Sequence, residues 1–265
     1  MADSKIEMSK ITEPSNQPAT FGPVAPYYDE LMSGVPYQFW VDYIKNVWRR
    51  HSRVPQSILD VACGTGTVSR LLTRLGYRVA GVDLSQGMID IAKEKASAEA
   101  LDIDFRCQDA AEIDLGGQTF DAAISLFDSL NYILDPERLQ AAFAHIERHL
   151  ASGGSFFFDM NTEVALAEGM FNQSCSRKVE PLNYRWRSRY DANTQICTVN
   201  MRFSYEMSDG QRQIFKEVHR QRCYPTADLC DWLKAAGFAE VFVYDSYTLK
   251  PPRPYSDRLF FMALK

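Results

Sequence analysis

The sequence predicts a doubly wound α/β fold with a mostly parallel, seven-stranded sheet and a small antiparallel β insert. Three observations predict it. Apolar strands alternate with amphipathic helices over about 100 residues, a long stretch of period-two alternation follows, and two closing strands have no helix between them. Strands that follow each other without a helix pair antiparallel. We therefore expect one late antiparallel strand in an otherwise parallel sheet.

Two regions precede the alternating part. Residues 1–20 are polar and carry Asp3 and Glu7, so they lack the basic start and apolar stretch of a signal peptide. We expect a flexible tail there. Residues 27–50 are rich in aromatic side chains and have helical periodicity, with a break at Gly34–Pro36. We expect helix on this stretch, interrupted at the break.

The alternating part starts with an apolar strand over residues 57–62. A helix over 67–75 follows, with its leucines on one face, and Gly76 marks its end. Pro136 begins a later helix, where its missing N–H costs nothing, and Gly153–Gly154 is expected to turn the chain into the fifth strand. The remaining predicted elements are a strand ending at Asp83, a helix over 86–100, a strand ending at Asp109, a strand over 120–127, a helix over 136–150 and a strand over 155–161.

The alternation of strands and helices stops after the fifth strand. Residues 183–223 alternate with a period of two, which predicts an antiparallel meander with turns at 191–193 and 208–210. A helix over 226–236, capped by Gly237, and strands over 239–247 and 257–264 complete the chain. We therefore expect three units: a tail of residues 1–20, a core of residues 21–160 and 224–265, and an insert or cap of residues 161–223.

Composition limits the classes of function. Hydrophobic residues make up 46% and charged residues 24% of the chain, which is ordinary for a globular protein with a core. The net charge of −5 gives no global positive field to attract nucleic acid or anionic lipid, so we expect neither as a partner. No apolar run approaches the ~20 residues of a membrane-spanning helix, so we expect no membrane partner. Six cysteines without a Cys-x-x-Cys pair and only four histidines predict reduced thiols in a cytoplasm and no metal site.

Four aspartates fall at or just past predicted strand ends: Asp60, Asp83, Asp109 and Asp128. Ligands of an open α/β sheet bind at the carboxyl ends of its strands. Four carboxylates there would repel a pyrophosphate and suit a zwitterion, a ribose and an exocyclic amine. The alternative for any single aspartate is capping of the next helix.

The segment ILDVACGTG, residues 58–66, places two glycines at the mouth of this site. Gly64 and Gly66 have no Cβ, so the backbone can approach a ligand closely. Asp83 follows Asp60 at a spacing that suits a carboxylate accepting hydrogen bonds from ribose hydroxyls. The glycine loop and the aspartates together predict a nucleoside-containing, cationic ligand.

Four segments resemble the class I S-adenosylmethionine-dependent methyltransferases: DVACGTG (60–66), GVDLSQGMIDIAKEK (81–95), CQDAAEID (107–114) and FDAAISLFDSLNYI (120–133). The resemblance covers roughly residues 20–160 and the terminal hairpin, and Ala62 departs from the glycine of the strict motif. It is strongest to small-molecule enzymes with an antiparallel insert after the fifth strand, such as sugar-amine and glycine or sarcosine N-methyltransferases, where a Tyr-Tyr-Asp element like Tyr27–Asp29 recurs. It implies a Rossmann-like fold, S-adenosyl-L-methionine as cofactor, and in-line methyl transfer to a small amine or hydroxyl.

The resemblance also implies a role for each matched position. Asp60 would hold the methionine ammonium, directly or through water, Asp83 the ribose hydroxyls, and Asp109 the adenine amino group. Further contacts to the cofactor would come from Ala62, Cys63, Gly64, Gly66, Leu84, Met88, Ala110 and the backbone carbonyl of Leu126.

Candidates on the acceptor side each have a structural alternative. Tyr28 and Tyr37 would close over the sulfonium or its carboxylate, or belong to a core aromatic cluster. Asp128 would orient or deprotonate the acceptor, or cap a turn. His219 is a candidate general base, or a half-exposed strand residue.

An arginine row marks the predicted insert. Arg185, Arg187 and Arg189 alternate with aromatic residues, so their guanidinium groups share one sheet face. The row either binds a phosphate or carboxylate of the acceptor or is a solvated face paired with acids such as Glu206 and Glu217. The opposite, apolar face would pack on the core or on a second subunit, so a homodimer stays open.

Three other functions remain compatible with the sequence. An RNA- or protein-directed methyltransferase needs an added binding surface, and only the arginine row suggests one. A NAD-dependent oxidoreductase is opposed by Ser69 at the third fingerprint position and by Asp60, which would face the pyrophosphate. A non-catalytic module that retains the fold is the third alternative.

Overall fold

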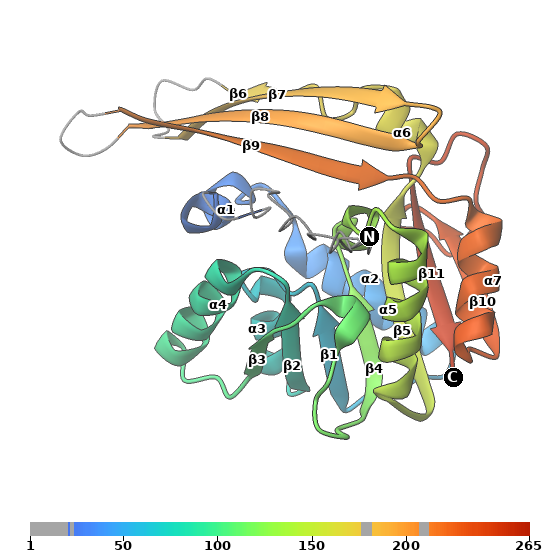
Figure 1. Cartoon of the computed structure of the whole chain (residues 1–265). Coiled ribbons are helices and arrows are strands. Elements are labelled where there is room, and N and C mark those ends of the chain that lie inside the picture. Colours follow the sequence, from blue (N-terminus) through green and yellow to red (C-terminus); the bar gives the residue numbers. More distant parts are fainter. Residues whose placement is uncertain (1–20, 22–23, 176–181, 207–211) are drawn as a thin grey trace, which may run out of the picture.

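The computed structural model describes residue 21 and residues 24–175, 182–206 and 212–265. The expected tail (1–20) and the expected turn at 208–210 lie outside the described residues. Figure 1 shows a large sheet flanked by helices and a smaller sheet lying over one of its ends. None of the helices in the described ranges combines the length and apolar character that a membrane crossing requires.

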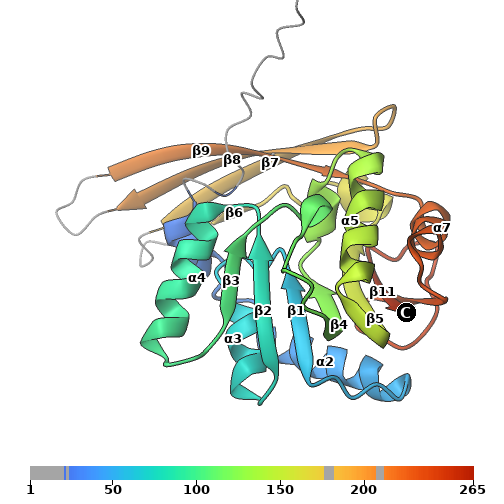
Figure 2. The same ribbon diagram turned by 60° about the horizontal axis from the view of Figure 1, so that its bottom comes forward.

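The large sheet has seven strands in the order β10-β11-β5-β4-β1-β2-β3, and Figure 2 shows β3, β2, β1 and β4 side by side. Its strands are β1 (Ser57–Val61), β2 (Arg78–Asp83), β3 (Asp104–Cys107), β4 (Phe120–Ser125), β5 (Leu150–Asn161), β10 (Glu240–Asp245) and β11 (Arg258–Leu264). β11 pairs antiparallel with both β5 and β10, whereas β1 to β5 pair in parallel. The predicted fold class, with its single late antiparallel strand, is confirmed.

Helices cover both faces of this sheet. Apolar side chains of α2 and α3 pack on one face, and those of α5 and α7 pack on the other. The longer helices are α2 (Tyr37–Arg50), α3 (Thr67–Arg74), α4 (Gln86–Ala98), α5 (Pro136–Arg148) and α7 (Thr226–Ala236). The short ones are η1 (Ala25–Tyr27), α1 (Tyr28–Leu31), η2 (Ala110–Glu112), η3 (Ser129–Tyr132) and α6 (Glu163–Ala167).

The expected turn before the fifth strand is wrong. β5 begins at Leu150, and its pairing with β4 shifts register beyond Phe120, which pairs with Leu150. Gly153 has a φ of +74°, and a Cβ on Gly154 would lie 2.8 Å from the carbonyl oxygen of Ala151. The two glycines therefore make an irregularity inside the strand rather than a turn in front of it.

The smaller sheet has four strands in the order β6-β7-β8-β9. They are β6 (Ser174–Cys175), β7 (Leu182–Asp191), β8 (Ile196–Glu206) and β9 (Arg212–Arg222), all antiparallel to their neighbours. η3, which follows β4, contacts β9. The insert therefore lies over the carboxyl ends of the parallel strands, where ligands of this architecture bind.

Phe105 of β3 fixes the position of the loop after β1. A Cβ on Gly81 would lie 2.6 Å from the Phe105 ring and 2.9 Å from Cys63 Sγ. A Cβ on Gly66 would lie 2.7 Å from the same ring. The ring thus fills the space that two missing side chains leave, and it holds the loop against β2.

This packing predicts the effect of one added methyl group. Gly81→Ala should lower the free energy of unfolding by about 1–3 kcal/mol, because the new Cβ overpacks the space between Phe105 and Cys63. Gly34→Ala is the matched control, since nothing lies within 4 Å of the added Cβ. Urea denaturation measures both, and equal stabilities of the two variants would contradict this account of the packing.

Candidate active site

Asp83 holds the glycine-rich loop from the end of β2. Its Oδ2 accepts a hydrogen bond from the Gly64 N–H at 2.8 Å, and its Oδ1 accepts one from the Ser85 N–H at 2.8 Å. The loop enters α3 through left-handed backbone at Ala62 (φ +60°), Gly64 (+55°) and Gly66 (+72°). Ala62 is the position that departs from glycine, and the fold still imposes the left-handed conformation there, at a cost in strain.

Asp60 lies buried on β1 next to this loop. It is 3% exposed, and its Oδ2 accepts a hydrogen bond of 2.5 Å from Ser69 Oγ. Burial raises the pKa of Asp60 to about 7, the Ser69 hydroxyl opposes the rise, and the charge of Asp83 adds to it. Burial also raises the pKa of Asp83. Two neighbouring carboxylates with raised pKa values suit a cationic ligand, because its positive charge would favour the ionised form of both.

A pocket joins the glycine loop to the end of β4. Seven residues predicted from the sequence line it: Tyr28, Tyr37, Asp60, Ala62, Cys63, Gly64 and Leu126. Thr65, within the stretch Ala62 to Gly66 expected to surround the methionine and ribose, lines it too, and sequence reasoning missed four more lining residues: Thr67, Val68, Phe127 and Ser129. Most of them could have been found from their position, because they lie in or next to the loops after β1 and β4, where the sequence already predicts ligand contacts.

Tyr37 belongs to an aromatic cluster as well as to this pocket. Its ring meets Phe127 edge-on with centroids 5.2 Å apart, and Trp40 packs on Phe127 at 4.2 Å. Burial raises the pKa of Tyr37 to about 12, and burial likewise raises the pKa of Tyr28. Both phenols are therefore neutral hydrogen-bonding groups at physiological pH.

The residues expected around adenine lie outside the lining of the pocket. Leu84 is 71% exposed just after β2, and Met88 is buried among the core residues of α4. Asp109 Oδ1 caps η2 by accepting a hydrogen bond from the Ala111 N–H, and Oδ2 pairs with Arg138 at 2.7 Å. Ala110 packs against the core. The capping alternative is thus observed for Asp109, and its contact to adenine stays a prediction.

His219 lies on the inner face of the insert and is 2% exposed, so the half-exposed alternative is wrong. Its Nε2 lies 2.6 Å from Glu217 Oε2, and its Nδ1 lies 3.1 Å from the Tyr132 hydroxyl. Glu217 Oε1 also accepts a hydrogen bond from the Val24 N–H. Sequence reasoning missed Tyr132, and it placed Glu217 beside the arginine row. The period of two puts Glu217 on the face of His219 instead.

The Phe21 ring contacts residues of both the polar chain and the pocket. Its ring centroid lies 4.6 Å from that of His219, 5.4 Å from that of Tyr132 and 5.7 Å from that of Tyr28. Its φ of +65° is unusual for a bulky residue. One ring therefore connects the cofactor pocket, through Tyr28, with the polar groups under the insert.

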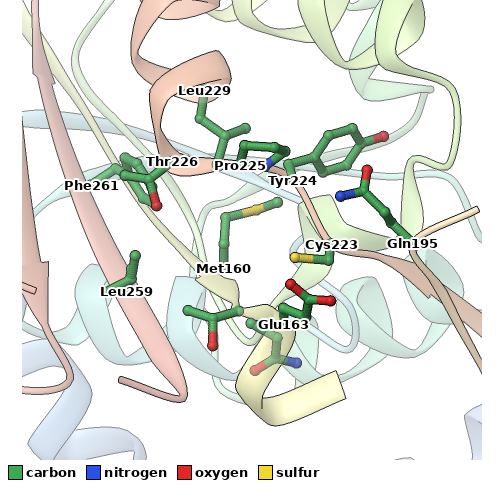
Figure 3. A pocket seen from close by; sticks show the side chains of 12 residues that line it. Met160, Glu163, Gln195, Cys223, Tyr224, Pro225, Thr226, Leu229, Leu259 and Phe261 are labelled. Atoms are coloured by element: carbon green, nitrogen blue, oxygen red, sulfur yellow. The ribbon is translucent and has the colours of Figure 1, made fainter. Parts of the chain in front are cut away.

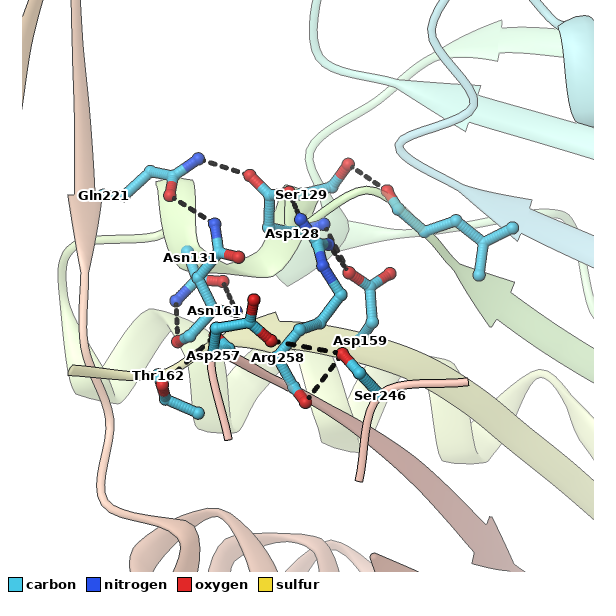
Figure 4. A network of polar contacts seen from close by, with 11 residues as sticks. Asp128, Ser129, Asn131, Asp159, Asn161, Thr162, Gln221, Ser246, Asp257 and Arg258 are labelled. Atoms are coloured by element: carbon cyan, nitrogen blue, oxygen red, sulfur yellow. Dashed lines mark hydrogen bonds and ion pairs between the residues drawn. The ribbon is translucent and has the colours of Figure 1, made fainter. Parts of the chain in front are cut away.

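Asp128 belongs to a buried ion-pair network (Figure 4). Its Oδ1 pairs with Arg258 Nη2 at 2.8 Å, and its Oδ2 accepts a hydrogen bond of 2.5 Å from Gln221 Nε2. Arg258 also pairs with Asp159, whose pKa burial raises to about 6 although the guanidinium opposes the rise. The Asp128 side chain caps no backbone N–H of η3, so the turn-capping alternative is wrong. A carboxylate with both oxygens engaged positions groups better than it accepts a proton.

A larger cavity, of about 220 Å³, lies where the insert joins the core (Figure 3). Its wall includes Glu163, Gln195, Cys223 and Leu229, and none of the sequence-predicted site residues lines it. Within the described ranges no three His, Cys, Asp or Glu residues come together as metal ligands. The chemistry predicted from the sequence thus belongs to the pocket at the glycine loop.

Asp29 ties the N-terminal helix α1 to this pocket. Its Oδ1 accepts a hydrogen bond of 2.6 Å from Thr65 Oγ1 in the glycine loop, and its Oδ2 pairs with Lys95 of α4. The ion pair is partly exposed, so the partly buried hydrogen bond to Thr65 carries most of the stabilisation. Tyr28, which lines the pocket, is the neighbouring residue and is positioned by the same contact.

Removing this contact should loosen α1. Asp29→Ala is expected to speed hydrogen exchange of the α1 amides roughly fivefold, the equivalent of about 1 kcal/mol for one hydrogen bond. Glu30→Ala is the matched control, because Glu30 is an exposed carboxylate of the same helix. Exchange measured by mass spectrometry on residues 24–33 decides the point. Equal protection in both variants would show that Asp29 does not hold the helix.

Known proteins are similar to this chain in sequence and in fold. Residues 58–154 match the model of a methyltransferase domain. The chain is 30% identical over 247 residues to a Geobacillus sp. (strain WCH70) protein named as a methyltransferase, with 93% of this chain and 100% of the relative covered. It is 37% identical over 105 residues to the dTDP-3-amino-3,4,6-trideoxy-alpha-D-glucopyranose N,N-dimethyltransferase of Streptomyces venezuelae, which covers 39% of this chain and 42% of the relative.

A solved structure extends the likeness to the whole chain. The crystal structure of an S-adenosylmethionine-dependent methyltransferase from Clostridium acetobutylicum ATCC 824 superposes with a TM-score of 0.80 at 26% identity, covering 92% of this chain and 98% of that one. The matched domain comprises residues 58–154, and the structural agreement extends beyond it. The chain belongs to the class I S-adenosylmethionine-dependent methyltransferases.

Proposed function

We propose that the protein methylates a small molecule, at an amine or a hydroxyl, in the space between the glycine loop and the inner face of the insert. One observation carries the proposal: the buried Tyr132–His219–Glu217 chain of polar contacts meets the cofactor pocket through Phe21 and Tyr28. The sheet of the insert covers this space, so a small acceptor suits it better than a macromolecule. The sugar N,N-dimethyltransferase relative supports an amine as one acceptor class.

The cofactor is assigned to the acidic side of the pocket. Asp60 holds the methionine ammonium, and Ala62 to Gly66 surround the methionine and ribose. Each oxygen of Asp83 accepts one backbone hydrogen bond and has a second lone pair for a ribose hydroxyl. Leu84, Met88, Asp109 and Ala110 remain the proposed adenine side.

The sulfonium of the cofactor supplies an activated methyl group. The protein then has to align the acceptor with it and exclude water. Tyr28 and Tyr37 line the pocket as neutral phenols, whose oxygens can face a positive sulfonium without carrying a full charge. Asp128, fixed by Arg258 and Gln221, orients the acceptor from the opposite side.

A proton can leave the acceptor through the insert. Glu217 as a carboxylate only accepts hydrogen bonds, so His219 carries its proton on Nε2 and accepts on Nδ1 from the Tyr132 hydroxyl. The phenol oxygen of Tyr132, which the Gln221 side chain also contacts, can then accept from an acceptor N–H or O–H. A proton passed through Tyr132 to Nδ1 gives an imidazolium that Glu217 stabilises, as a carboxylate does in a hydrolase triad.

Binding of the cofactor should release a proton from Asp60. The pKa of Asp60 in the free protein is about 7, and the methionine ammonium favours the ionised form. Affinity for S-adenosylmethionine should therefore rise up to about tenfold per pH unit below 7 and level off above it. Calorimetry at about pH 6.5 in two buffers of different ionisation enthalpy measures the released proton. Asp60→Asn should remove the buffer dependence, and equal heats for the wild type would contradict the placement of the ammonium.

Breaking the polar chain under the insert should slow catalysis without weakening cofactor binding. His219→Gln and Tyr132→Phe are each expected to lower kcat about 10²–10⁴-fold, with an unchanged Kd for S-adenosylmethionine. Asn200→Ala, on the exposed face of β8, is the control and should match the wild type. The substrate is the best acceptor from a panel of small amines, amino sugars, phenols and alcohols.

The same panel distinguishes the alternatives. Pools of RNA and of peptides are added to it as macromolecular acceptors. Methylation of a pool but of no small molecule would overturn the proposal in favour of a macromolecule-directed enzyme. Wild-type kcat in His219→Gln would leave a small-molecule enzyme that works by alignment alone.

A further inference from the structure

The outer face of the insert carries six cations in register. Arg185 of β7 pairs with Arg202 of β8, which pairs with Lys216 of β9, so three positive side chains form one row across the sheet. The other three are Arg187, which pairs with the neutral Asn200, and Arg189 and Arg220, which lie on either side of the neutral Thr198 of β8. All six side chains are exposed.

The acidic side chains of the described residues on this face lie beside the six cations rather than among them. Glu217, expected to pair with the arginine row, points to the opposite face and binds His219. Asp191 and Glu206 lie at the two ends of β7 and β8, outside the rows of cations. The one contact described for the six is a hydrogen bond of 2.9 Å from Arg187 Nη1 to the carbonyl oxygen of Trp186. The expectation that acids pair across the strands with the row is thus wrong for Glu217.

The face cannot serve the acceptor of the methyl group. His219 and Tyr132 lie on the inner side of the insert, and the sheet separates them from the arginine row. Figure 1 shows the outer side turned away from the core. The cations therefore suit a partner that binds the outer surface of the protein. They do not suit the molecule that is methylated.

The shape of the face selects among anionic partners. The aromatic residues of β7, Tyr184, Trp186 and Tyr190, pack on the inner side, so the described outer face offers no rings on which bases could stack. Three strands about 4.8 Å apart and about ten residues long present roughly 500 Å², below the ~800 Å² per partner of a stable protein complex. The exposed Ile214 and Val218 add a small apolar strip on β9.

We propose that this outer face docks on the surface of an anionic lipid bilayer. A nearly flat array of cations with a short apolar strip matches the headgroup layer, and no base-stacking or deep complementarity is needed. Each Lys or Arg near such a surface is worth about fivefold in partitioning. This proposal departs from the expectation, drawn from the composition of the whole chain, of no membrane partner. The net charge of −5 does not cancel the attraction of this face, because charges beyond a Debye length of about 8 Å are screened.

Co-sedimentation of the full chain with vesicles tests the proposal. Vesicles of phosphatidylcholine alone are compared with vesicles of phosphatidylcholine and phosphatidylserine, at low and at high salt. The wild type should bind only the anionic vesicles, and high salt should release it. The triple variant Arg185→Gln, Arg187→Gln, Arg189→Gln should bind about a hundredfold more weakly.

A second triple variant controls for net charge. Arg50→Gln, Lys93→Gln, Lys234→Gln removes three exposed cations outside the insert and should bind as the wild type does. An equal loss in both variants would overturn the proposal, as would binding to neutral vesicles. Tighter binding to an RNA oligonucleotide or to polyglutamate than to anionic vesicles, at the same salt, would replace the bilayer by that partner. Circular dichroism and cofactor calorimetry show that the variants are folded.

Discussion

The bond between Asp83 and the Gly64 N–H is the contact on which the cofactor side of the molecule depends. It fixes a strand-to-helix turn that contains three left-handed residues, and it keeps the acid close enough to Asp60 for its charge to raise the pKa of Asp60. Because a carboxylate holds the turn, the side chain that shapes the loop is also an acidic one. Shape and charge thus come from one side chain, and together they select a cation.

The insert sorts its side chains by alternation alone. One residue step along β9 separates the buried Glu217 and His219 from the exposed Val218 and Arg220. A slip of one residue would exchange the two faces, and both the polar chain of the acceptor space and the cationic surface would be lost. The 11-residue strands β8 and β9, paired over their full length, specify the register strongly.

The order of strands and helices could be predicted from the sequence because apolar periodicity is a local signal. The carboxylates at Asp60 and Asp83 could also be predicted, since strand ends and a glycine turn are local as well. The partners of Asp128 could not. Arg258 is 130 residues away in the chain, and its contact follows from sheet order rather than from any short pattern. Tyr132 was missed for the same reason, because it meets His219 only when β9 lies on η3. Glu217 is different, since the period of two along β9 already places it on the face of His219.

β11 lies between two strands that precede it in the sequence. Until its residues are synthesised, β5 has an open edge and β10 has no neighbour in the large sheet. Arg258 opens that strand, so the carboxylates of Asp128 and Asp159 also lack their counter-ion until then. A nascent chain can therefore form its early strands and helices while it is still attached to the ribosome. Its reaction centre can assemble only after almost the last segment has emerged.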